Sequence, residues 1–137
     1  MMNEPLSTIM STKLVTVNKY ATLDKVKEVL DTKRYHHVPI VDGTKLVGII
    51  TTHDLYRLNK PFSEYPNINV TDVMTDHIAT LEPTDKVGAA CQVFLENKFH
   101  AVPIVQDGEL VGLVTSFDLL RYEFKKEYKD ADLWLKK

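Results

Sequence analysis

Two short polar motifs hold the residues of this chain that could do chemistry. Each has a threonine followed three positions later by an aspartate, Thr51 with Asp54 and Thr115 with Asp118. An ionised aspartate only accepts hydrogen bonds, and its two oxygens can receive both hydroxyls of a vicinal diol such as that of a ribose. A threonine that begins a helix stands beside free backbone N–H groups, which together with the helix dipole can hold a phosphate. This spacing therefore suits a nucleotide.

The same residues also have a purely structural interpretation. A threonine three residues ahead of an acid is the capping-box pattern of a helix start. Ile50 with Leu55, and Val114 with Leu119, stand at the positions of the matching hydrophobic staple. Each cap contributes about 1 kcal/mol to stability. From the residues alone, helix cap and nucleotide contact both remain open, and one residue can serve as both.

A glycine precedes each motif. Gly48 and Gly112 lie three residues ahead of the two threonines. A glycine inside a strand lets another group approach the backbone closely, or it marks a bend in the strand. The sequence leaves both explanations open.

The motifs belong to an internal repeat. Residues 36–57 align with 100–121 without a gap, at an offset of 64, and twelve of the twenty-two pairs are identical. The alignment extends upstream, where 7–10 matches 71–74. A period of this length indicates two copies of one small domain rather than a solenoid. We expect repeats at 7–59 and 70–122, a linker at 60–69 and a helical extension over 123–137.

Within one repeat, the pattern predicts the elements that must position the motif. Residues 14–17 suit a short strand, and apolar residues at helical spacing predict an amphipathic helix over 22–34. Two apolar runs, 38–41 and 45–50, predict a hairpin around an Asp-Gly turn. A second helix then begins at Thr51. The repeat is therefore a β-α-β-β-α unit, and the fold class is α/β (α+β).

Composition and charge exclude several classes of protein. A net charge of −2 gives no field that would attract nucleic acid. No apolar run approaches the roughly 20 residues that a membrane helix needs. The first ten residues lack the pattern of a secretory signal, and Cys91 is the single cysteine. We therefore expect a reducing, cytoplasmic location, with no membrane or nucleic-acid partner.

The sequence does not favour catalysis or a metal site. Adjacent helical residues such as His53 and Asp54 point about 100° apart, so they do not form a proton relay. No repeated serine or cysteine nucleophile accompanies them. His36 and His37 alternate faces in an extended chain, so they do not ligate one ion together. We predict that the protein is not an enzyme and has no metal ligands.

Taken together, the motifs resemble a tandem pair of CBS domains, the family named after cystathionine β-synthase. The resemblance covers residues 7–122 and is carried by HHVPIV and LVGIITTHD in the first repeat and by HAVPIV and LVGLVTSFD in the second. The family's motif is Gly-h-x-Thr/Ser-x-x-Asp, in which h is apolar. It stands intact in both copies, from Gly48 to Asp54 and from Gly112 to Asp118.

This resemblance implies a regulatory module whose two repeats pack through their sheets around a pseudo-twofold axis. Many members bind adenosine derivatives in the two resulting clefts: AMP, ADP, ATP, S-adenosylmethionine or NAD. By similarity, each aspartate would hold a ribose diol, each threonine would approach the phosphates, and the base side would come from the opposite repeat. The cleft with Thr115 and Asp118 would use Leu14, Val15, Tyr35 and His36, and the cleft with Thr51 and Asp54 would use Ile78, Ala79, Phe99 and His100.

The two copies differ where a cation could face a phosphate. His37 has Ala101 as its counterpart, and His53 has Phe117, so we predict two unequal clefts. We expect a stand-alone, homodimeric, ligand-sensing module that acts on an unknown effector protein by changing its own shape. The alternative is a dimerisation or protein-interaction module without a small-molecule ligand, in which the threonines and aspartates are only caps.

Overall fold

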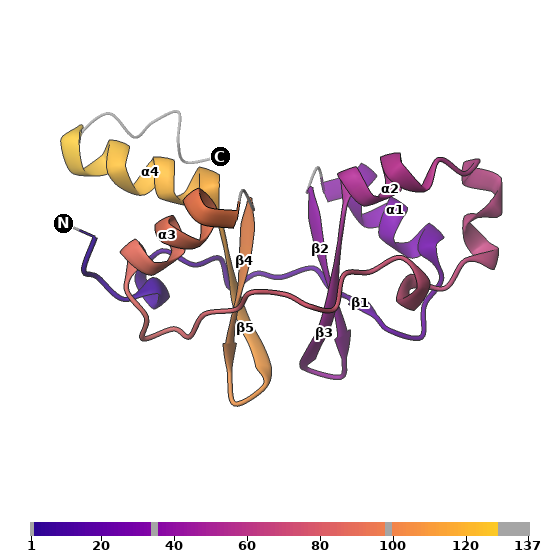
Figure 1. Ribbon diagram of the computed structural model, residues 1–137, viewed down its shortest axis with the longest axis horizontal. Helices are drawn as coiled ribbons and strands as arrows, with labels where there is room; N and C mark the ends of the chain where they lie inside the picture. The colour runs from indigo at the N-terminus through magenta and orange to yellow at the C-terminus, as the bar shows by residue number, and fades with distance from the viewer. Residues whose placement is uncertain (1, 34–35, 98–99, 129–137) are drawn as a thin grey trace. The chain divides into compact units, whose positions relative to one another are not determined.

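The computed structural model of the chain describes residues 2–33, 36–97 and 100–128. These residues form two compact units (Figure 1). The first-repeat unit comprises Lys13–Ile78 and Asp107–Leu110, and the second-repeat unit comprises Met1–Thr12, Ala79–Gln106 and Val111–Lys137.

The first-repeat unit is a small sheet with helices on one side. Its elements are β1 (Val17–Asn18), α1 (Leu23–Lys33), β2 (His37–Asp42), β3 (Lys45–Thr51) and α2 (Thr52–Leu58), followed by the 3-10 helices η2 (Phe62–Asn67) and η3 (Val70–Asp72). The strands lie in the order β1-β2-β3, with β1 parallel to β2 and β2 antiparallel to β3. Helices α1 and α2 lie on one side of the β2–β3 hairpin (Figure 1). Val26 and Leu30 of α1 pack in one core with Val38 and Ile40 of the sheet.

The second-repeat unit follows the same plan. Its elements are the 3-10 helix η1 (Leu6–Thr8), α3 (Val87–Asn97), β4 (Ala101–Gln106), β5 (Glu109–Thr115) and α4 (Ser116–Glu127). Strands β4 and β5 pair, and both helices lie on one side of them (Figure 1). Val87, Val102 and Val114 form the centre of its core. The mixed α+β class and the predicted order of helix, hairpin and helix are confirmed in both units.

The first strand of each repeat differs from the prediction. A strand was expected over 14–17, but β1 contains only Val17–Asn18, which pair with Ile40 and Val41 of β2. Its counterpart in the second repeat is a single parallel bridge between Leu81 and Ile104. The apolar run ahead of each pairing is extended without joining a ladder.

The two hairpin turns explain why the Asp-Gly dipeptide shifts by one position between the repeats. In the first turn Gly43 has a positive φ of 65° and Thr44 does not have one, whereas in the second turn both Asp107 and Gly108 do, with φ of 54° and 82°. These signs match a type II′ turn and a type I′ turn, the two-residue turns whose twist suits a hairpin. Two turn types of equal length therefore keep the repeats in register.

Each unit includes the segment that precedes the first strand of the other repeat, which we call the lead segment of that repeat. Residues ahead of β1, within Met1–Thr12, belong to the second-repeat unit, where the N–H of Leu6 donates to the carbonyl of Asp85 at 2.8 Å. The equivalent bond in the first-repeat unit runs from Val70 to Ala21 at 3.1 Å. Leu6 and Val70 are both fully buried. The boundaries of the compact units therefore differ from the boundaries of the sequence repeats.

A side-chain contact also holds the first lead segment on α4. The hydroxyl of Tyr122 donates to the carboxylate of Glu4, and this bond lowers the pKa of Glu4. The ammonium of Lys126 lies 4.2 Å from the ring centre of Tyr122. Helix α4 continues past Arg121, as expected for a helical extension, and the expected extension beyond Tyr128 lies outside the described residues.

The segment expected as a linker, 60–69, contributes to a core. It contains η2, and Tyr65 within it is only 1% exposed among the apolar residues of the first-repeat unit. The ring of Phe62 stands edge-on to that of Tyr65, with 5.3 Å between their centres. An aromatic side chain of this size gains more from burial than a polar loop residue, so the segment packs down on the unit.

The two strand glycines are explained by the lead segments. A Cβ atom built on Gly48 would lie 2.4 Å from the sulfur of Met74, and one built on Gly112 would lie 2.5 Å from the sulfur of Met10. The backbones are joined nearby, since Ile49 and Thr75 exchange two hydrogen bonds of 3.0 Å. Close approach of another group, rather than a bend, is therefore the reason for glycine at these positions.

Replacing one of these glycines should destabilise the fold by overpacking. We expect Gly48→Ala to lower the free energy of unfolding by about 1–3 kcal/mol, because Met74 must move away from the new methyl group. Urea denaturation of Gly48→Ala, Met74→Ala and the double variant measures the coupling between the two sites. The double variant should recover part of the loss caused by Gly48→Ala. Strictly additive losses would contradict this explanation.

Candidate functional site

Both threonine–aspartate motifs form complete capping boxes. The N–H of Asp54 donates to the hydroxyl of Thr51 at 3.2 Å, and the N–H of Thr51 donates to Oδ2 of Asp54 at 2.8 Å. The corresponding distances between Asp118 and Thr115 are 3.3 and 2.8 Å. The structural interpretation of these residues is therefore confirmed, and the cap engages one oxygen of each carboxylate.

Most of the other polar groups at the two helix starts are also engaged. The N–H of Thr52 donates to the carbonyl of His36 at 3.1 Å, and that of Ser116 donates to the carbonyl of His100 at 3.0 Å. Within the described part of the chain, the N–H groups of His53 and Phe117 have no such partner. A ligand at either helix start would therefore find one free amide and the second carboxylate oxygen, Oδ1. We call these two places the first half-site (Thr51, His53, Asp54) and the second half-site (Thr115, Phe117, Asp118).

The residues predicted to face the base lie in two extended segments. Leu14 and Val15 are half-buried, as are Ile78 and Ala79. The backbone of 13–16, and that of its counterpart 77–80, makes no hydrogen bond with any described residue. A backbone that has free N–H and C=O groups must pair with water or with a ligand. These segments therefore offer the donors and acceptors that the edge of a purine needs.

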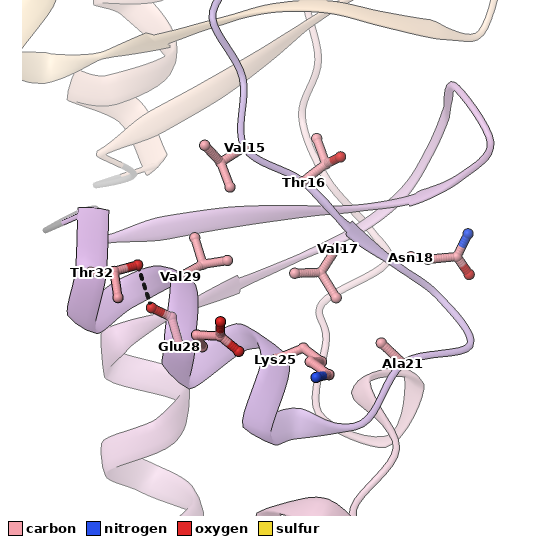
Figure 2. Close-up of a pocket in the computed structure, with 9 residues that line it drawn as sticks. All are labelled: Val15, Thr16, Val17, Asn18, Ala21, Lys25, Glu28, Val29 and Thr32. Carbon is pink, nitrogen blue, oxygen red and sulfur yellow. Dashed lines mark hydrogen bonds between the residues drawn. The ribbon is translucent and has the colours of Figure 1, made fainter.

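Val15 also lines a pocket of about 430 Å³ between its segment and α1. This volume is within the usual range for small-molecule sites, ~300–1,000 Å³. Figure 2 shows Lys25 and Glu28 of α1 across the pocket from Val15 and Thr16. Thr32 lies at its end and donates its hydroxyl to the carbonyl of Glu28 at 2.7 Å. The pocket thus has an apolar floor and a rim with charges of both signs.

Sequence reasoning missed the α1 side of this pocket. Lys25, Glu28 and Thr32 follow one another at helical spacing along the edge of the buried face, a signal that could have identified them. The second repeat has Ala89 and Gln92 at the positions of Lys25 and Glu28. A rim with charges of both signs is therefore a feature of the first repeat only.

The remaining predicted site residues divide into two groups. His36 and His100 are exposed, and their carbonyls bind the helix start of their own repeat. Tyr35 and Phe99 lie outside the described residues. The assignment of each base segment to the half-site of the other repeat remains a prediction.

Fold and half-sites together define a class: a module of two α+β repeats, each presenting a capped aspartate at the start of its second helix. The chain belongs to the CBS domain family, since the model of the CBS domain matches residues 6–60 and 70–125. It is thus a CBS domain pair.

Relatives and solved structures agree with this assignment. Protein MJ1225 of Methanocaldococcus jannaschii is 31% identical over 121 residues, which are 87% of this chain and 42% of that protein. The crystal structure of CBSX2 in complex with AMP is similar with a TM-score of 0.79 and 26% identity, covering 90% of this chain and 98% of that one. The same four values describe the similarity to the CBS domain pair of MJ0100 in complex with 5′-methylthioadenosine and S-adenosyl-L-methionine.

The chain spans less than half of the length of the curated relatives that it matches. Among the helices of 2–33, 36–97 and 100–128, none has the length and apolar composition required to cross a bilayer.

Proposed function

We propose that this CBS domain pair is a regulatory module that binds an adenine nucleoside or nucleotide and carries out no catalysis. The observation that carries the proposal is the half-site at each helix start, where the cap leaves one aspartate oxygen and one amide N–H for a ligand. Similar CBS domain pairs bind AMP, or 5′-methylthioadenosine with S-adenosyl-L-methionine. All of these ligands share a ribose carrying an adenine, which fits the chemistry of a carboxylate beside an extended backbone segment.

In the proposed complex, Asp54 or Asp118 accepts hydrogen bonds from the ribose diol through Oδ1. A phosphate, where the ligand has one, approaches the threonine and the free amide at the helix start. The adenine lies against the backbone of the segment 13–16 or 77–80 from the other repeat. The ligand changes the state of a cytoplasmic effector protein only to the extent that it binds two shapes of the module with different affinity.

A thermal unfolding assay tests this function. AMP, ADP, ATP, S-adenosylmethionine, NAD and 5′-methylthioadenosine are added at millimolar concentration, with GMP as the control for base recognition. A ligand at 100 times its dissociation constant should stabilise the folded state by about 2.7 kcal/mol, which raises the melting temperature measurably. Equal shifts with GMP, or no shift with any adenosyl compound, would contradict the proposal.

The second candidate function is assembly without a small-molecule ligand. The observation that favours it is the exposure of apolar side chains on α3 and α4: Leu95 is 77% exposed and Leu120 is 66% exposed. A second copy of the chain would cover these side chains in a homodimer. A dimer detected by light scattering, in a protein that no adenosyl compound stabilises, would favour assembly over ligand sensing.

A further inference from the structure

The two half-sites differ in what stands beside their aspartates. In the second half-site, Nη1 of Arg121 lies 3.8 Å from Oδ1 of Asp118, the oxygen that the cap leaves open. The guanidinium carbon of Arg121 lies 4.8 Å from the ring centre of Phe117. The side chain of Asp118 is only 14% exposed and that of Arg121 35%, so solvent screens this pair less than one on the open surface.

The first half-site has the same arginine without this arrangement. Arg57 stands at the position equivalent to Arg121, but it is exposed and makes no ion pair or ring contact with the described residues. His53 takes the place of Phe117, and its ring stacks on that of Tyr56, with 6.3 Å between the centres and 5° between the planes. The arginine is therefore held at the aspartate in the half-site that has phenylalanine, and it is not held there in the half-site that has histidine.

The position of Arg121 suits an exchange of partners. Side chains on a helix lean toward its N-terminus, so the guanidinium covers the first turn of α4, where the phosphate of the proposed ligand would lie. Its Nε is buried without a hydrogen-bond acceptor among the described residues, which is an unfavourable state for a charged donor. A guanidinium binds phosphate through two parallel hydrogen bonds, which would supply the missing acceptor.

We propose that Arg121 is a specificity-determining residue of the second half-site. It pairs with Asp118 when no ligand is present, and it pairs with the 5′-phosphate when a nucleotide is bound. Because the ribose diol must share Oδ1 with Arg121 unless a phosphate draws the guanidinium away, this half-site favours adenosine 5′-phosphates over adenosine itself. The first half-site lacks this preference. The inference rests on the function proposed above for the same half-sites.

Calorimetry with AMP and adenosine tests the inference at one half-site at a time. The Asp54→Asn background silences the first half-site, and Arg121→Gln is compared with its parent there. We expect Arg121→Gln to weaken AMP binding about 10-fold or more, as for loss of a charge-assisted hydrogen bond, and to leave adenosine within about twofold or bind it more tightly. The matched control is Arg57→Gln in the Asp118→Asn background, which should leave both ligands within about twofold.

A second readout does not depend on affinity. The ¹⁵N-labelled Nε–H signal of Arg121 should shift on addition of AMP and stay in place on addition of adenosine, while that of Arg57 stays in place with both. Phe117→His should reduce the preference for AMP in the same way as Arg121→Gln.

Four outcomes would overturn the role of Arg121. Equal weakening of AMP and adenosine by Arg121→Gln would show that it only supports the fold. An equal effect of Arg57→Gln would show that the half-sites do not differ. A parent protein that binds neither compound would overturn the proposed function and this inference together, whereas a parent that binds both with equal affinity would overturn this inference alone.

Discussion

We expect the Leu6→Ala variant to lose about 2–5 kcal/mol of unfolding free energy, the usual range for removing a buried leucine side chain. Leu6 lies near the start of the chain, but it is fully buried in the core of the second-repeat unit. Its backbone is held there too, because its N–H donates to Asp85 and the N–H of Val87 donates to Glu4, at 2.8 and 2.9 Å. Truncation to alanine leaves a cavity. These hydrogen bonds hold the segment in place, so it cannot move to fill the cavity. Urea denaturation measures the loss.

We also expect the loss of stability in Leu6→Ala to be confined to the second-repeat unit. Amide hydrogen exchange in Leu6→Ala should accelerate first in β4 and β5, for example at Val102 and Val114, and not in β2 and β3. The matched variant Val70→Ala should give the reverse pattern, since Val70 occupies the equivalent position in the core of the first-repeat unit. Ser7→Ala, which changes an exposed neighbour, should be nearly silent. Accelerated exchange in β2 after Leu6→Ala would show that the lead segments are not exchanged.

Local patterns predicted the elements, but they could not predict how the segments combine. The helix α1 follows from apolar residues at helical spacing, and both hairpins follow from apolar runs around a glycine turn. The exchange of lead segments leaves no such trace. Leu6 and Val70 are separated by the repeat offset of 64 residues, so either arrangement of the leads gives the same sequence pattern. Only packing, such as that of Met74 against Gly48, distinguishes the two arrangements.

The candidate site was predicted to the level of residue types and not to the level of atoms. Spacing identified Thr51, Asp54 and their counterparts as helix caps, which the structure confirms. Spacing does not say whether the cap engages one carboxylate oxygen or both, because this depends on the side-chain rotamer. It also gave no sign that Arg121 stands at Asp118 while Arg57 is exposed. That difference accompanies a ring contact of Arg121 with Phe117, which fills a variable position inside the motif.

Replacing both aspartates by asparagine should separate the two roles that the sequence left open. In Asp54→Asn/Asp118→Asn, the amide oxygen can still accept the N–H of Thr51 or Thr115, so most of each cap is retained. Loss of the negative charge at a helix start costs about 0.3–1 kcal/mol per helix. The ribose diol, by contrast, would face an NH₂ group instead of a carboxylate oxygen. We expect affinity for AMP to fall about 10- to 100-fold, the equivalent of losing a hydrogen bond to a charged group.

Alanine at the same positions provides the reference for this experiment, because it removes the carboxylate half of each capping box and the ligand contact together. The asparagine variant should therefore melt close to the parent protein without ligand, and the alanine variant well below it, while both lose the stabilisation by AMP. Thr51→Ser/Thr115→Ser keeps the hydroxyl of each cap and should resemble the parent in both measurements. If the asparagine variant were stabilised by AMP as strongly as the parent, the aspartates would be caps alone, and the carboxylate oxygen that each cap leaves open would not be the ribose site.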